Sequence, residues 1–232
     1  MKKNIPTLSI IICVYNDKSF ILEALKRVEN AFIPGFCKEI IIVDDCSTDG
    51  GQDILKKLPK KYKIIFHKKN LGIGGALRSG IRIATGKYIA RQDDDLEYNP
   101  EEIYYLLHPL ITNQADIVYG SRTLNHNNQY SKKTYYLGGK LMNSIFNILY
   151  FNTISDFITG SKVFKTDIIK KLDLKSNGFE VESEISAKAI KKGYRIVSLP
   201  ISYNPRSFKQ GKKIRWHHAI SIIRTLLKYR FM

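Results

Sequence analysis

The sequence predicts an α/β fold, with a mostly parallel sheet flanked by helices, in a chain of 232 residues. Two observations predict it. Short apolar, β-branched runs alternate with stretches of helical periodicity up to about residue 120. The apolar runs are nearly continuous rather than alternating, which is typical of strands that a parallel sheet buries on both faces.

The first half of the chain supplies the regular alternation of strands and helices. Strands are expected at residues 8–14, 39–43, 62–66, 87–90 and 116–119. Helices are expected at residues 19–29 and 51–58, in the segment that a turn at residues 70–75 opens and that runs through residue 84, and at residues 99–110. The last of these helices has a strong start signal, because Asn99 can cap it, Pro100 fits its first position and Glu102 its third.

Beyond Gly120 the alternation becomes irregular. We expect a polar loop at 123–134, a helix at 140–151, a strand or turn at 155–165, a helix at 180–191, a strand at 194–199 and a basic loop at 204–215. The last segment, residues 216–232, places apolar residues on one helical face and basic residues on the other. The prediction is therefore one domain over residues 1–215, followed by a C-terminal amphipathic helix, 216–232, suited to a membrane surface.

The chain carries a large excess of positive charge, with 38 Lys and Arg residues against 21 Asp and Glu residues and a net charge of +17. Such an excess predicts an anionic partner, which is nucleic acid, anionic lipid or a phosphorylated substrate. No nucleic-acid-binding motif is present, so we expect no nucleic-acid partner. A lysine-rich surface without a specific partner is the alternative reading of the charge.

The cysteines and the apolar segments bear on location. The three cysteines include no C-x-x-C pair, which argues against a disulfide framework or a zinc site and favours a reducing cytosol. The N-terminal apolar run is too short for a signal peptide and no cleavage site follows it. No stretch approaches the roughly 18–20 apolar residues of a membrane-spanning helix. The prediction is a cytoplasmic protein that meets a membrane only at its surface.

Two acidic clusters follow predicted strands, Asp44 with Asp45 and Asp93 to Asp95. In a parallel α/β sheet, ligands bind at the carboxyl ends of the strands. Asp93 and Asp95 are two residues apart and project to one side, while Asp94 points away as a spacer that faces solvent or the sugar. Two convergent carboxylates suit Mg²⁺ or Mn²⁺ shared with a substrate diphosphate. A solvated turn before a helix would explain the same acidic run.

Several short motifs extend this pattern in a fixed order along the chain. They are residues 12–17 (ICVYND), 43–50 (VDDCSTDG), 70–76 (NLGIGGA), 84–89 (ATGKYI), 93–97 (DDDLE), 120–122 (GSR) and 178–182 (GFEVE). On these motifs the chain resembles, over nearly its whole length, the family 2 glycosyltransferases of the GT-A, Rossmann-like fold. Within that family it is most similar to the dolichyl-phosphate mannosyltransferase and polyprenyl-phosphate glycosyltransferase group.

The resemblance implies a role for each motif residue. The nucleotide-sugar pocket would be lined by Tyr15, Asp17, Asp44, Asp45, Gly72, Gly74, Gly75 and Asp94. The metal would be held by Asp93, Asp95 and Glu97, with Glu97 at a position where the family often has Gln. The glycines would let the backbone approach the nucleotide, since they lack a Cβ atom. Two departures from the family pattern are Cys13, where Pro is usual, and Asp17, where Glu is usual.

The acceptor is predicted from what the chain lacks. A hydroxyl acceptor needs a general base, and no carboxylate occupies the place of the family's E-D motif. The matching region, residues 156–164 (DFITGSKVF), is instead similar to the S-G-F-R segment of the polyprenyl-phosphate group. A phosphate acceptor is already anionic and needs only cations to hold it. The residues expected to act in catalysis are Asp95, Arg122 and Arg206, and the acceptor phosphate would meet Arg122, Lys133, Lys140, Arg206 and Lys212.

The predicted function is inverting transfer from GDP-mannose or a UDP-hexose to a dolichyl or undecaprenyl phosphate, with Mg²⁺ or Mn²⁺. The helix at 140–151 and the C-terminal helix have apolar faces flanked by basic residues, which favours a peripheral location on the cytoplasmic membrane face, where a membrane protein partner is also expected. The first alternative is a saccharide hydroxyl acceptor, with Asp156 or Glu182 as base. The second is a non-enzymatic module that binds anionic membranes or nucleic acid.

Overall fold

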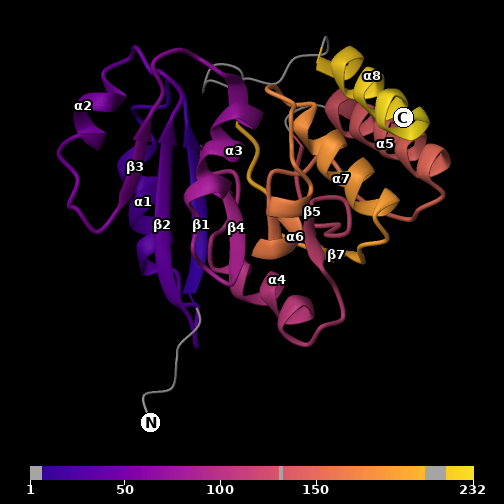
Figure 1. Ribbon diagram of the computed structural model, residues 1–232, viewed down its shortest axis with the longest axis horizontal. Helices are drawn as coiled ribbons and strands as arrows, with labels where there is room; N and C mark the ends of the chain where they lie inside the picture. Colours follow the sequence, from indigo (N-terminus) through magenta and orange to yellow (C-terminus); the bar gives the residue numbers. More distant parts are fainter. Residues whose placement is uncertain (1–6, 131–132, 207–217) are drawn as a thin grey trace.

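A seven-stranded sheet forms the centre of the computed structural model, which describes residues 7–130, 133–206 and 218–232 (Figure 1). The strand order is β3-β2-β1-β4-β6-β5-β7. The strands are β1 (Thr7–Val14), β2 (Cys37–Asp44), β3 (Lys63–Phe66), β4 (Tyr88–Asp93), β5 (Ile117–Ser121), β6 (Lys162–Lys165) and β7 (Ile196–Pro200). All neighbouring pairs are parallel except those of β6, which runs antiparallel to both β4 and β5. The predicted α/β class and mostly parallel sheet are confirmed.

Helices cover both faces of this sheet. They are α1 (Ile21–Asn30), α2 (Gly51–Leu55), α3 (Gly72–Ile83), α4 (Glu102–Ile111), α5 (Lys133–Tyr150), α6 (Thr166–Lys171), α7 (Val181–Lys191) and α8 (His218–Phe231). One core lies between the sheet and the side carrying α3, α5, α6, α7 and α8. The other core lies between the sheet and α1, α2 and α4.

Strand β1 shows why the sequence forms a sheet covered on both faces. Successive side chains of a strand point to opposite faces, so Ile11 joins one core while Ile10 and Ile12 join the other. All three are buried, and a polar residue on either face would have to be accommodated inside a core. The unbroken apolar run is therefore what this position in the sheet requires.

The structure differs from the sequence-based prediction mainly after residue 121. Helix α5 begins at Lys133, well before the predicted residue 140, although its first part is polar and includes Gly138 and Gly139. The ring of Tyr136 in this first part packs 4.6 Å from the ring of Tyr130. The short helix α6 was not predicted, because a helix of six residues is too short to show a clear period.

Helix α8 packs on the body of the fold beside α5 and α7, at the end of the molecule opposite α2 and β3 (Figure 1). Ile222 and Leu226 are buried, the Tyr150 hydroxyl donates to the Leu226 carbonyl over 2.7 Å, and the Tyr229 hydroxyl donates to Glu184 Oε1 over 2.8 Å. No helix among the described residues is long and apolar enough to cross a membrane.

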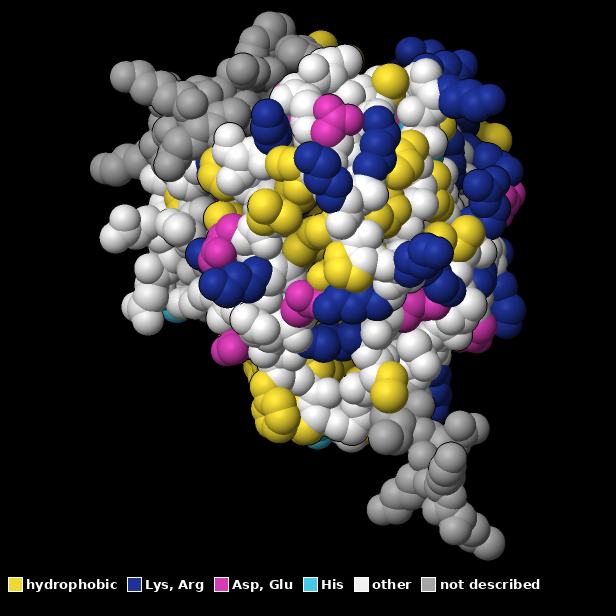
Figure 2. Space-filling model, turned by 90° about the vertical axis from the view of Figure 1, so that its left-hand side faces the viewer, with side chains coloured by type: hydrophobic (Ala, Val, Ile, Leu, Met, Phe, Trp, Pro, Cys, Tyr) yellow, Lys and Arg dark blue, Asp and Glu magenta, His cyan; other side chains and the backbone are white. Residues whose placement is uncertain are grey.

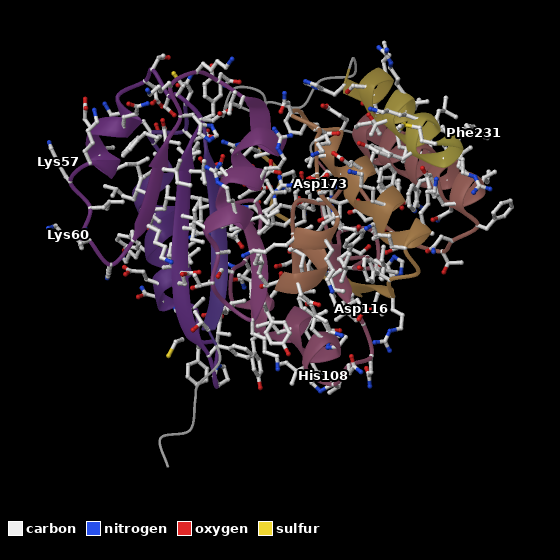
Figure 3. The ribbon with its side chains drawn as sticks, in the orientation of Figure 1. Lys57, Lys60, His108, Asp116, Asp173 and Phe231 are labelled. Atoms are coloured by element: carbon white, nitrogen blue, oxygen red, sulfur yellow. The ribbon has the colours of Figure 1, made fainter. Side chains whose placement is uncertain are left out.

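The opposite end of the molecule is basic (Figure 2). Lys57 and Lys60 project from the loop after α2 (Figure 3), and Lys56, Lys61 and Lys63 are exposed near them. Lys56, Lys61 and Lys63 each pair with a nearby carboxylate. Lysines beside the edge strand β3 also oppose pairing with another sheet. This part of the net charge is explained by a solvated surface.

Candidate active site

The two acidic clusters meet at one edge of the sheet. Strands β2, β1 and β4 are adjacent and parallel, with Val14 opposite Asp44 and Cys13 opposite Asp93. The carboxyl ends of these strands therefore lie side by side, as the sequence predicts. The loops that follow them carry Asp45, Asp95 and Asp17 into the same region.

Asp45 organises the turn that leads into α3. Its Oδ1 accepts a hydrogen bond from the Leu71 backbone N–H over 2.9 Å and lies 2.7 Å from His67 Nδ1. Its Oδ2 accepts from the Gly72 N–H over 2.7 Å. Both oxygens are thus engaged within the protein, so Asp45 fixes the Gly-rich turn beside the predicted nucleotide pocket.

Asp44 is fully buried below the same loop. Its Oδ1 accepts from the Ser47 N–H over 3.1 Å and from Gln52 Nε2 over 2.7 Å. Its Oδ2 has no hydrogen-bond partner among the described residues. Of the two aspartates, Asp44 therefore keeps the unsatisfied oxygen, and contact with a nucleotide base stays a prediction for both.

The glycines of the turn allow a close contact within the protein. The Asn177 carbonyl oxygen accepts from the Gly74 and Gly75 N–H groups over 2.6 and 3.2 Å. A Cβ atom at Gly72 or Gly74 would overlap the carbonyl oxygen of Asn177 or Ser176. Their lack of a side chain thus serves the approach of the loop before α7, and nucleotide contact at these glycines stays a prediction.

Replacing Gly72 with Ala is expected to lower the free energy of unfolding by about 1–3 kcal/mol, because Gly72 combines a φ of +80° with the Asn177 contact. Gly35→Ala is the matched control, since Gly35 has the same φ of +80° with nothing within 4 Å of its Cβ position. Urea unfolding of both variants should show the larger loss for Gly72→Ala. Equal losses would mean that backbone strain alone accounts for the effect.

The three aspartates at the end of β4, Asp93 to Asp95, have different surroundings. Asp93 Oδ1 accepts from Arg91, while Asp95 Oδ2 accepts from Arg206 Nη2 over 3.0 Å. Burial, followed by the charges of Asp93 and Glu97, raises the pKa of Asp95 to about 7. Asp94 was expected to face solvent or the sugar; it does not face solvent, because it is 5% exposed, and contact with the donor sugar stays a prediction. Asp94 lies beside Ile12, Ile21 and Leu25, which belong to the core that α1, α2 and α4 cover.

Arg206 lies among the carboxylates of this site rather than apart from them. Its Nη1 donates to Asp17 Oδ1 over 3.0 Å and its Nη2 to Asp95 Oδ2 over 3.0 Å. Its backbone N–H donates to Glu97 Oε1 over 2.7 Å, and its guanidinium lies 5.2 Å from the Phe20 ring. The predicted phosphate-binding arginine therefore serves here as a counter-charge for Asp17 and Asp95.

Glu97, the third predicted metal ligand, already binds groups of the protein. Glu97 accepts through Oε2 from the Tyr203 hydroxyl over 2.9 Å and through Oε1 from the Arg206 backbone. Within the described part of the chain, no three His, Cys, Asp or Glu side chains surround one cation position. Mg²⁺ is commonly held by one or two carboxylates together with substrate phosphates. Asp93 and Asp95 fit a cation that arrives with a diphosphate, because a cation would offset the repulsion from Asp93 and Glu97 that contributes to the raised pKa of Asp95.

Arg122 and Asp156 form a second ion pair, in which the Asp156 side chain is 4% exposed and that of Arg122 is 19% exposed. Arg122 donates to both carboxylate oxygens of Asp156, over 2.8 Å from Nε and 2.9 Å from Nη2, and its backbone N–H adds a third bond of 3.2 Å. Its guanidinium also lies 5.3 Å from the Tyr203 ring. Asp156 thus lacks the open oxygen that a general base requires.

Glu182, the other candidate base, is also enclosed. It accepts hydrogen bonds from Arg91 and from Lys162, and all three side chains are buried. Sequence reasoning missed Arg91 and Lys162 as parts of the site. The available signal was the charged Arg91 directly after the apolar residues 88–90 of β4, since a buried charge requires a partner.

Of the remaining predicted site residues, two are exposed and two have side chains that the structure does not describe. The side chains of Lys133 and Lys212 fall outside the described residues. The Lys140 ammonium lies 4.6 Å from the Tyr136 ring, and Tyr15 is 37% exposed at the end of β1. Contacts of these four residues with donor or acceptor stay predictions.

Comparison with known proteins was made by sequence and by structure. Residues 9–173 match the family described as glycosyl transferase family 2. The dolichol-phosphate mannosyltransferase of Pyrococcus furiosus is 29% identical over 210 residues, which cover 88% of this chain and 58% of that protein. The low-salt glycan biosynthesis hexosyltransferase Agl6 of Haloferax volcanii is 29% identical over 223 residues, covering 92% and 52%. The chain thus spans little more than half the length of these relatives.

Among solved structures, glucosyl-3-phosphoglycerate synthase from Mycobacterium tuberculosis in complex with UDP has the same fold. The TM-score is 0.75 at 15% identity, with 98% of this chain and 81% of that chain covered. The same enzyme in complex with Mn²⁺, UDP and glucosyl-3-phosphoglycerate gives a TM-score of 0.73. With the GT-A fold and more than half of the chain matched by the family model, this protein belongs to glycosyl transferase family 2.

Proposed function

We propose that the protein is an inverting, divalent-metal-dependent glycosyltransferase that moves a sugar from GDP-mannose or a UDP-hexose to a polyprenyl phosphate. The observation that carries the proposal is the enclosure of Asp156 and Glu182, each ion-paired and 4% exposed, which leaves neither candidate base open to a hydroxyl acceptor. A phosphate acceptor needs no base. The relative named dolichol-phosphate mannosyltransferase supports this acceptor class.

The residues at the carboxyl ends of the strands would bind different parts of the donor. Tyr15 and Asp44 would contact the nucleotide, and Asp93 and Asp95 would hold Mg²⁺ or Mn²⁺ at the donor diphosphate. When bound, the cation neutralises charge that develops on the leaving diphosphate. The solved structure of glucosyl-3-phosphoglycerate synthase in complex with Mn²⁺ and UDP supports this class of donor and this class of metal.

Arg206 would hold the acceptor phosphate. Its guanidinium already lies beside Asp95, and its planar fork suits a phosphate as well as a carboxylate. We propose that Arg206 exchanges its carboxylate partners for the acceptor phosphate when donor and acceptor are bound. Arg122 would be the second phosphate contact, and it would have to leave Asp156 to act in this way.

A membrane surface would supply the lipid. Helices α5 and α8 lie side by side and expose large apolar side chains, as expected for helices that rest in a membrane interface. These side chains are Leu137, Leu141 and Ile148 on α5 with Phe151 just after it, and Ile220, Leu227 and Phe231 on α8 with Met232 at the end of the chain. Phe231 projects outward from the end of α8 (Figure 3). Peripheral attachment to the cytoplasmic face is part of the proposal.

The test is a donor screen that measures nucleotide release with and without a short polyprenyl phosphate. We expect release from one donor to require both the lipid phosphate and Mg²⁺ or Mn²⁺, and to stop when EDTA is in excess. Full activity in excess EDTA would contradict the metal role. Release that the lipid phosphate does not stimulate, but a saccharide does, would contradict the acceptor.

A further inference from the structure

A chain of four charged side chains leads from the candidate site into the core. Asp93 Oδ1 accepts from Arg91 Nε over 3.2 Å and from Arg91 Nη2 over 3.1 Å. Arg91 Nη1 donates to Glu182 Oε1, and Glu182 Oε2 accepts from the Lys162 ammonium. The charges alternate in sign along this chain and sum to zero. Arg91, Glu182 and Lys162 are named here the buried triad.

The sheet itself brings the two cations of the buried triad together. Strands β4 and β6 are antiparallel, and Arg91 lies directly opposite Lys162. Like charges at opposed positions destabilise a sheet unless something separates them. Glu182, from α7, provides that separation because it binds both cations.

Lys162 is fully buried and its hydrogen bonds are complete. Besides Glu182, the ammonium donates to the carbonyl oxygens of Phe157, over 3.0 Å, and Thr159. An ammonium carries three hydrogens, so none is left for a ligand. Lys162 therefore acts only through the groups that it holds.

Such an arrangement is costly for a purely structural core, since apolar side chains of similar volume are often at least as stabilising as a buried ion pair. The chain of charges also has a direction. The side chains of Arg91, Glu182 and Lys162 are 5%, 6% and 0% exposed, whereas that of Asp93 is 21% exposed. The chain therefore opens to the site at Asp93.

The contacts of Asp93 fix its orientation. Both hydrogen bonds from Arg91 converge on Oδ1, and Oδ2 is directed at Gly160, where a Cβ atom would overlap it. A carboxylate ligand held by outer hydrogen bonds presents a defined oxygen to a cation. Loss of such outer partners typically lowers metal affinity by about 10–100-fold.

We infer that the buried triad of Arg91, Glu182 and Lys162 positions Asp93 for the complex of divalent cation and donor diphosphate. The inference rests on the proposed function, since it takes Asp93 as a ligand of that cation. The three are positioning residues that set the affinity for the cation and nucleotide without contacting either.

The test compares Mn²⁺ binding in the presence of UDP or GDP, measured by the electron paramagnetic resonance signal of unbound Mn²⁺. Glu182→Gln alone would leave two opposed cations and is expected to fold poorly. The informative variant is therefore Glu182→Gln with Lys162→Met, which removes one charge of each sign. We expect this double variant to remain folded in thermal unfolding and to bind Mn²⁺ about 10–100-fold more weakly.

The matched control is Asp116→Asn with Lys165→Met, which removes another carboxylate–ammonium pair, 2.7 Å apart, whose lysine lies on the same strand β6 as Lys162. Lys165 lies opposite Tyr88, at the start of β4. Asp116, labelled in Figure 3, directly precedes β5. We expect this control variant to be less stable than the unsubstituted protein and to bind Mn²⁺ with the same affinity.

Unchanged Mn²⁺ affinity in the Glu182–Lys162 double variant, or an equal loss in the control, would overturn the positioning role. Failure of the unsubstituted protein to bind Mn²⁺ with either nucleotide would instead overturn the metal role in the proposed function, and this inference with it. The two failures are thus told apart by the unsubstituted protein alone.

Discussion

Replacing Asp95 with Asn is expected to lower the rate of sugar transfer by about 100- to 1,000-fold, the usual loss when one group that stabilises transition-state charge is removed. Burial and its acidic neighbours raise the pKa of Asp95 to about 7, so its charge depends strongly on its surroundings. Asparagine keeps the shape and removes the charge that the cation needs. The measurement is transfer at saturating donor, with Mn²⁺ titrated.

The control for this variant is Asp53→Asn, the same substitution at an exposed site where Asp53 pairs with Lys56. It should transfer sugar at the unsubstituted rate. Thermal unfolding should also show that Asp95→Asn is folded. Activity of Asp95→Asn within a few-fold of the unsubstituted protein would rule out Asp95 as a metal ligand.

Replacing Arg206 with Ala is expected to destabilise the protein by about 3 kcal/mol at neutral pH without metal, since removing one partner of a buried ion pair typically costs about 3–5 kcal/mol. Arg206 is the counter-charge of Asp17 and Asp95 in this structure. A divalent cation can supply that charge in its place. Added Mn²⁺ should therefore raise the melting temperature of Arg206→Ala more than that of the unsubstituted protein.

The pH dependence of this variant has a definite sign. The pKa of Asp95 in the folded protein, about 7, lies above its ordinary value of 3.8, so the contribution of this group to stability falls as the pH rises between these values. Arg206 lowers this pKa, although burial, Asp93 and Glu97 outweigh it. In Arg206→Ala the pKa of Asp95 should be higher still, so the contribution of Asp95 to stability should go on falling up to a higher pH. Equal Mn²⁺ and pH responses in both proteins would contradict the counter-charge role.

The strands and the site edge could be predicted from sequence because they depend on local patterns. Continuous apolar runs identified β1, β2 and β4, and parallel pairing then placed Asp44 and Asp93 at one edge. The length of α5 and the presence of α6 could not be predicted. A polar or very short helix depends on what it packs against, which the period of the sequence does not show.

The partners within the site could not be predicted, because they join distant parts of the chain. Arg206 and Asp17 are 189 residues apart, and Arg91 and Glu182 are 91 apart. The residue types alone indicated that the site binds ions, because it combines arginines with clusters of acidic residues. Whether that ion is a substrate phosphate or the protein's own carboxylate is decided by the three-dimensional fold.

The nature of the acceptor is the central claim, and one comparison tests it most directly. A short polyprenyl phosphate and the corresponding polyprenol would be offered separately, with the donor found by the screen, and sugar transfer to each lipid measured. Because Asp156 and Glu182 are enclosed by cations, we predict transfer to the phosphate and none to the alcohol. Transfer to the polyprenol at a comparable rate would show that the site activates a hydroxyl, and would contradict the account.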